Sequence, residues 1–153
     1  MLDLTYDPTR YIVDPNESRW IVLTSSLFVL PGLYGYYNEL YNVFYVLLAT
    51  SLISINYWRS PRYSCERMLD LTFAKISAIL FAINGIMNVR HFYGYQCLFL
   101  MLYCYYKSTN SSNSEWVKYH AAFHFFTICG QFFVIHAILK NKEESQGKCF
   151  YLC

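Results

Sequence analysis

The chain has 153 residues, the size of one domain, with 12 Lys or Arg, 10 Asp or Glu and a net charge of +2. Charged residues make up only 14% of it and hydrophobic residues 56%, which excludes a disordered chain, a coiled coil and an ordinary water-soluble domain. The nearly balanced charge gives no sign of nucleic-acid binding. Aromatic residues reach 20%, and Tyr and Trp favour the boundary between lipid and water.

Five stretches of the sequence are poor in charge and long enough to cross a membrane. A helix rises about 1.5 Å per residue, so about 20 residues cross a hydrocarbon core of about 30 Å. We therefore predict an all-α fold, a multi-pass transmembrane helical bundle of about five spans. The spans cover residues 20–38, 40–58, 68–89, 91–106 and 116–139, between a polar N-terminal segment of residues 1–19 and a polar, cysteine-containing tail of residues 140–153. The alternative, a soluble bundle, needs a charged face on each helix, and none of the five shows one.

The segments between the spans have the composition of turns and loops. Glu39 is the only charged residue between the first two spans, which predicts a tight hairpin. Pro31, followed by Gly32, lies inside the first span and predicts a kink there. Residues 59–67 and 107–115 are rich in charge or in Ser and Asn, and we predict loops in both.

The orientation in the membrane stays open from the sequence. Five spans put the two termini on opposite sides, and the N-terminal side carries seven Lys or Arg outside the spans against four on the other. That bias favours a cytoplasmic N-terminus. Two candidate glycosylation sites, Asn16 and Asn110, lie on the same side, and use of either one would reverse this orientation. Whether the membrane is the plasma membrane or an internal one stays open too.

The six cysteines show no metal-binding spacing. Cys149 and Cys153 lie in the tail near lysines, and both are candidates for palmitoylation if the tail is cytoplasmic. The last four residues do not form a prenylation box, because Phe150 stands where its cysteine belongs.

Two of the predicted spans carry polar side chains on one face. At about 100° per residue, the stripe on the last span falls within about 60° of arc and the stripe on the third within about 40°. The first stripe comprises His120, His124, Thr127 and Gln131, and the second comprises Asp70, Ser77, Asn84 and Asn88. His136 and Lys75 point away from their stripes. Because polar groups in a bilayer need partners, we expect the two stripes to face each other or a shared polar cavity.

Four of the polar residues share one depth. Ser54 lies one turn before the end of the second span, Asp70 in the first turn of the third, and His120 and His124 in the first two turns of the last. Two His at i and i+4 can bind one metal ion, such as zinc, which Asp70 can complete or support. The alternatives are hydrogen bonds between helices for the His pair, and a cap or a pair with Arg67 for Asp70.

These residues also resemble a known pattern. The second span ends in Ser54-Ile55-Asn56-Tyr57-Trp58, the third begins Met68-Leu69-Asp70, and the last contains His120-Ala121-Ala122-Phe123-His124. The pattern is similar to that of the membrane hydrolase superfamily that contains alkaline ceramidases and adiponectin-receptor-like proteins (CREST). Residues 20–31 (WIVLTSSLFVLP) are similar to the first span of the ceramidase branch. The resemblance implies zinc held by His120 and His124, with Ser54 and Asp70 as catalytic residues in the hydrolysis of a lipid amide.

The chain departs from that superfamily in two ways. The superfamily usually has seven spans, whereas this sequence predicts five. Its third histidine ligand falls near position 58, where this chain has Trp58. We therefore predict a small integral membrane protein whose interior polar site serves packing, lipid binding or the binding of a protein partner or second copy, without catalysis. The alternatives are a zinc-dependent lipid amide hydrolase and a transporter or channel lined by the two stripes.

Overall fold

The computed structural model describes residues 11–90, 92–111 and 114–150. This part of the chain is helical and contains no β-strand, so the all-α prediction is confirmed. Its helices are α1 (Pro15–Ser26), α2 (Val29–Tyr37), α3 (Tyr41–Trp58), α4 (Cys65–Asn88), α5 (Phe92–Asn110) and α6 (Ser114–Phe150).

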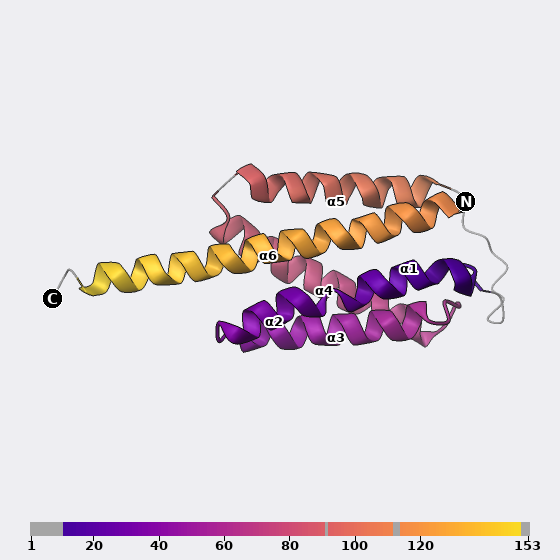
Figure 1. Ribbon diagram of the computed structural model, residues 1–153, viewed down its shortest axis with the longest axis horizontal. Helices are drawn as coiled ribbons and strands as arrows, with labels where there is room; N and C mark the ends of the chain where they lie inside the picture. The colour runs from indigo at the N-terminus through magenta and orange to yellow at the C-terminus, as the bar shows by residue number, and fades with distance from the viewer. Residues whose placement is uncertain (1–10, 91, 112–113, 151–153) are drawn as a thin grey trace.

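Helix α6 lies at the centre of the arrangement (Figure 1). It packs against α1, α2, α4 and α5, while α3 packs against α1, α2 and α4. In Figure 1, α5 runs along one side of α6, α1 to α3 lie on the other side, and α4 crosses obliquely. The C-terminal part of α6 extends past the other helices. Residues on α1, α3, α4 and α6 can therefore meet in one interior region.

The first predicted span is divided into α1 and α2. The break falls at Leu27 and Phe28, where the Leu30 amide donates to the Leu27 carbonyl at 3.0 Å in a tight turn. Proline has no N–H, and its ring clashes with the carbonyl four residues earlier, which for Pro31 is that of Leu27. The predicted kink is confirmed and lies one turn before the proline that causes it.

The turn between α2 and α3 is as tight as its composition predicts. Glu39 has a φ of 64°, a conformation that non-glycine residues seldom adopt, and the Leu40 amide then donates to the Gly35 carbonyl at 2.9 Å. The two helices approach closely behind the turn, since a Cβ atom on Gly32 would lie 3.3 Å from the Cβ of Leu47.

Two helices are longer than predicted. Helix α5 continues past residue 106, because the side chains of Ser108, Thr109 and Asn110 all donate to carbonyls of the preceding turn. Helix α6 continues through most of the predicted tail, where Lys and Glu favour helix and the Asn141 amide donates to the Asn88 side chain at 3.0 Å. The loop predicted for residues 107–115 is correspondingly shorter.

Large apolar side chains lie on the outer surface of several helices. Among the described residues, two helices are long and apolar enough to cross a membrane, α4 over Cys65–Asn88 and α6 over Glu115–Ser145. Of their most apolar stretches only 11% and 22% are buried, whereas the core helix of a soluble protein would be mostly buried. Large side chains such as Ile79, Ile86 and Phe99 point outward. Apolar surface on this scale favours a location in a membrane.

Candidate functional site

A cluster of buried polar side chains joins three helices near the start of α6. The Ser25 hydroxyl on α1 lies 3.0 Å from the Ser54 hydroxyl on α3. On α6, the Nδ1 atom of His124 lies 3.1 Å from the Thr24 hydroxyl and 3.5 Å from that of Ser25. Ser25, Ser54 and His124 are at most 5% exposed. The Ser54 hydroxyl is also within interaction range of the Asp70 carboxyl group, which brings α4 into the cluster.

The break between α1 and α2 helps to hold this cluster in place. A helix leaves the carbonyl groups of its last turn without intrahelical partners, and Ser25 lies in the last turn of α1. Its carbonyl accepts a hydrogen bond from the Ser51 hydroxyl of α3 at 2.9 Å. Small hydroxyl residues let two helices approach closely while they satisfy each other's polar atoms. The same carbonyl also accepts from the Phe28 amide at 3.3 Å, so one backbone oxygen at the break between α1 and α2 joins the turn to the neighbouring helix.

Aromatic rings enclose His120, one turn before His124. The Trp116 ring stacks on it, with centroids 5.0 Å apart and planes 15° apart. The Trp58 ring approaches from α3 with a centroid separation of 5.0 Å, and the ring of His124 lies 4.8 Å away. Trp58 is 5% exposed, so the position where the superfamily pattern has a third histidine is filled by a buried indole.

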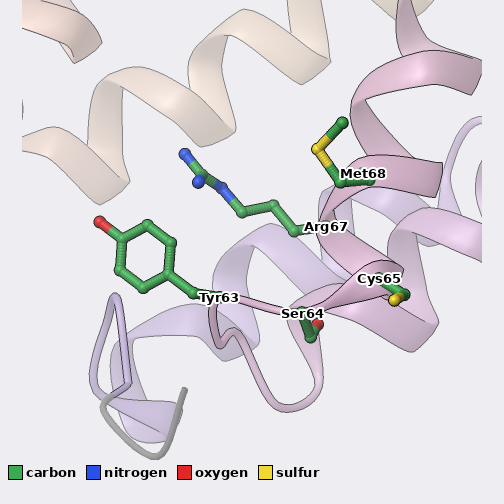
Figure 2. A pocket seen from close by; sticks show the side chains of 5 residues that line it. All are labelled: Tyr63, Ser64, Cys65, Arg67 and Met68. Carbon is green, nitrogen blue, oxygen red and sulfur yellow. The ribbon is translucent and has the colours of Figure 1, made fainter. Parts of the chain in front are cut away.

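Asp70 and Arg67 do not pair. Asp70 is 8% exposed and turns toward Ser54, and the structure shows no ion pair between it and Arg67. The Arg67 guanidinium instead lies 4.8 Å from the centre of the Tyr63 ring. Figure 2 shows the two side chains next to each other. These two residues line an open hollow with Ser64, Cys65 and Met68, at the junction of the α3–α4 loop and α4. That hollow shares no lining residue with the polar cluster.

The two polar stripes are not joined directly to each other. Residues of α1 and α3 lie between Asp70 and His124, so each binds a hydroxyl group of another helix. Thr127 and Asn84 bond within their own helices, to the carbonyls of Phe123 and Leu80. Asn88 donates to the Asn84 carbonyl and also accepts from the Asn141 amide of α6 at 3.0 Å. Helices α4 and α6 do pack together, but among the described residues no hydrogen bond joins a member of one stripe to a member of the other.

Two buried residues of the stripes, one on α4 and one on α6, each have a polar atom without a hydrogen-bond partner among the described residues. Ser77 and Gln131 are each 4% exposed, and within the described part of the chain Ser77 Oγ and Gln131 Oε1 accept or donate no hydrogen bond. His136, which was predicted to point away from the stripe, lies 3.3 Å from the Tyr34 hydroxyl of α2. The polar atoms of the stripe residues therefore differ in whether they have hydrogen-bond partners.

The donor groups do not fit the zinc site that the resemblance implies. A zinc site in a protein needs at least three ligand side chains. Among the side chains that the structure describes, no three His, Cys, Asp or Glu lie together so that they could hold a metal ion. The Nδ1 atom of His124 faces hydroxyl groups of α1, and Trp58 occupies the space beside His120. The metal role of His120 and His124 is not supported by this arrangement.

The candidate modification sites lie at the ends of helices. Asn16 is exposed in the first turn of α1, and Asn110 is exposed at the end of α5. The start of α1 and the end of α5 lie toward the same end of the molecule (Figure 1). Cys149 belongs to the last turn of α6, and Cys153 lies outside the described residues. Glycosylation and palmitoylation of these residues stay predictions.

Sequence reasoning found Ser54 but missed three other hydroxyl residues of the cluster, two on α1 and one on α3. Thr24, Ser25 and Ser51 supply most of its hydrogen bonds. The signal was present, since Thr24-Ser25-Ser26 interrupts an apolar span and Ser51 lies one turn before Ser54. Short hydroxyl side chains are common in membrane helices, however, and a pattern on one helix does not identify its partner on another.

Comparisons with protein-family models, with curated proteins and with solved structures found no match for this chain. What the fold and the polar cluster define is an all-helical bundle with an apolar exterior and a hydroxyl–imidazole interior. The relationship to CREST hydrolases stays a resemblance of short motifs.

The Ser25–Ser54 contact can be measured by a double-mutant cycle. We expect Ser25→Ala and Ser54→Ala to be coupled by about 0.6 kcal/mol, with about 1.7 kcal/mol as the upper bound, as for hydrogen bonds between membrane helices. The measurement is unfolding of the purified protein in mixed micelles. Ser26→Ala is the matched control, because the Ser26 hydroxyl bonds within its own helix to Leu23 at 2.7 Å. A coupling no larger for Ser25 than for Ser26 would contradict the hydrogen bond.

Proposed function

We propose that this chain is a small integral membrane protein with five spans, in which the buried polar cluster fixes the packing of the helices and carries out no catalysis. The observation that carries the proposal is the surface of α4 and α6, which is apolar enough for a membrane and mostly unburied. In water, such a surface would associate or precipitate. In a membrane, lipid chains contact this apolar surface directly, and no other protein surface has to bury it.

The lengths of the helices support five spans. Helices α1 and α2 together form one kinked span, and α3, α4, α5 and α6 supply one span each. Helix α3 has 18 residues and α5 has 19, close to the number that crosses a core of about 30 Å. Exposed aromatic side chains lie at or near helix ends, among them Tyr37 at 82%, Tyr41 at 49% and Tyr106 at 63% exposure. Such rings suit the two interfaces of a bilayer.

The cluster has the properties of a packing device. Lipid is as apolar as the helix surfaces, so the hydrophobic effect does not hold membrane helices together. Hydrogen bonds and close contacts between small residues take its place. Ser25, Ser51 and Ser54 link α1 to α3, while Thr24 and Ser25 link α1 to His124 on α6. Removing these contacts would leave buried polar atoms unpaired, so the cluster specifies one arrangement of the helices.

A hydrolytic role for the same residues is less well supported. Ser54, Asp70, His120 and His124 lie in one region, as the resemblance implies. The third imidazole of the superfamily pattern is missing, however, and the buried Trp58 fills its place. We therefore assign neither Ser54 nor Asp70 a catalytic role.

Membrane insertion and an odd number of spans are testable in one preparation. The full-length chain is expressed with a glycosylation acceptor tag at each terminus, in membranes that are then extracted with alkaline carbonate. We expect the protein to stay in the membrane pellet and only one of the two tags to be glycosylated. Release by carbonate would contradict an integral protein. Modification of both tags would contradict five spans.

A further inference from the structure

Lys75 lies near the middle of α4. It follows Cys65 by ten residues and precedes Asn88 by thirteen, which places it about 15 Å and about 20 Å from the two helix ends. No charged residue follows it in α4. If α4 crosses the membrane over residues 68–89, as proposed, the Lys75 side chain starts about 10 Å inside the nearer edge of the hydrocarbon core, deeper than its four-carbon stem extends.

The side chain points away from the rest of the molecule. Lys75 is five residues after Asp70 and two before Ser77, so on a helix it lies about 140° to 160° from both. Asp70 and Ser77 are the buried residues of α4, and Lys75 is exposed. Its neighbours on this outward face, Ala78, Ile79 and Ala82, are exposed as well.

Nothing in the described chain neutralises this charge. Lys75 forms no ion pair or hydrogen bond among the described residues, and Asp70 lies on the opposite side of the helix. Helices α3 and α6 pack against α4, but α3 contains no acidic residue and α6 has acidic residues only at its ends. A charged side chain inside a membrane is costly unless it is paired, and such residues usually face a partner or a wet cavity.

We propose that the outward face of α4 around Lys75 binds a membrane-spanning helix of a partner protein that carries an acidic residue at the same depth. The charge on Lys75 determines the chemistry of that partner. The small side chains of Ala78 and Ala82 permit the backbone of the partner helix to come close to α4. A second copy of this chain is the wrong occupant, because two α4 faces would oppose one Lys75 to another.

The test uses a model helix in place of the unidentified partner. The full-length protein, with a fluorescent domain at its C-terminus, is placed in phosphatidylcholine vesicles at neutral pH. A dye-labelled Leu/Ala helix of about 21 residues is added, with either Asp or Ala about seven residues from one end, which matches the depth of Lys75 in its span. Energy transfer reports association. We expect the Asp helix to associate above the level of random collision and the Ala helix to stay at that level.

Substitution at Lys75 decides the outcome. We expect Lys75→Met to weaken association with the Asp helix about tenfold, in line with a lost charge-assisted hydrogen bond. Ala82→Ile should weaken it as well, by blocking close approach. Lys118→Met is the matched control, because Lys118 is exposed in the first turns of α6, and it should have no effect.

Equal association of wild type and Lys75→Met with the Asp helix would overturn the proposal. So would association of neither model helix, or transfer between two labelled copies of the chain that equals that with the Asp helix. This inference rests on the membrane location proposed above, and carbonate extraction of each variant separates the two. Protein that stays in the membrane but ignores the Asp helix contradicts only the partner site, whereas protein released by carbonate contradicts the membrane location.

Discussion

Replacement of Trp58 by alanine should lower the free energy of unfolding by about 3–5 kcal/mol, the usual cost of removing a large buried aromatic side chain. Trp58 is 5% exposed, and its ring lies 4.7 Å from that of Tyr57, 5.7 Å from Trp116 and 5.0 Å from His120. It also belongs to the apolar core formed with Ile21 and Val117. Removing it opens a cavity where α1, α3 and α6 meet. Unfolding of purified protein in mixed micelles, followed by circular dichroism, measures the change.

Trp20 offers a control of the same residue type. Its side chain is 55% exposed on α1, so Trp20→Ala should change the free energy of unfolding by no more than about 0.5 kcal/mol in the same micelles. Similar losses from both substitutions would show that Trp58 packs no better than a tryptophan at the surface. The aromatic enclosure of His120 would then be wrong.

Replacement of Trp58 by histidine should create a zinc site. A histidine at this position would place a third imidazole beside His120 and His124, whose rings lie 4.8 Å apart. Three imidazoles are a sufficient ligand set for zinc. We expect the purified Trp58→His protein to hold about one zinc per chain, and zinc at a hundredfold excess over its Kd to stabilise it by about 2.7 kcal/mol. Metal analysis and thermal unfolding with and without zinc are the two measurements.

Two further variants separate metal binding from the loss of the indole. Trp58→Gln removes the same packing but adds no imidazole, and it should neither bind zinc nor gain stability from it. Adding His120→Ala to Trp58→His should abolish the zinc. Wild-type protein should hold far less than one zinc per chain. One zinc per chain in wild type would revive the hydrolase interpretation, and no zinc in folded Trp58→His protein would contradict the geometry inferred for the three positions.

The sequence predicted the helices well and their ends less well. Each long helix was found from a run of residues with little or no charge and from the charged residues that end the run. This works because the length of a helix and the polarity of its ends depend only on neighbouring residues. The kink before Pro31 and the hairpin at Glu39 follow from the backbone chemistry of those residues. The extension of α5 to Asn110 was missed, because Ser, Thr and Asn, which predict a loop, can also extend a helix by bonding back to its carbonyls.

The sequence by itself determined which residues of this protein are helical, which faces of α4 and α6 carry polar groups, and that Lys75 points away from the face of Asp70. Helical periodicity and charge content depend only on residues that are close together in the sequence, so both can be recognised without knowing the fold. Only the tertiary structure decided that His124 meets Thr24 and Ser25, about a hundred residues earlier, and that Trp58 closes over His120. Contacts between helices depend on how whole surfaces fit together, and no local pattern encodes that fit.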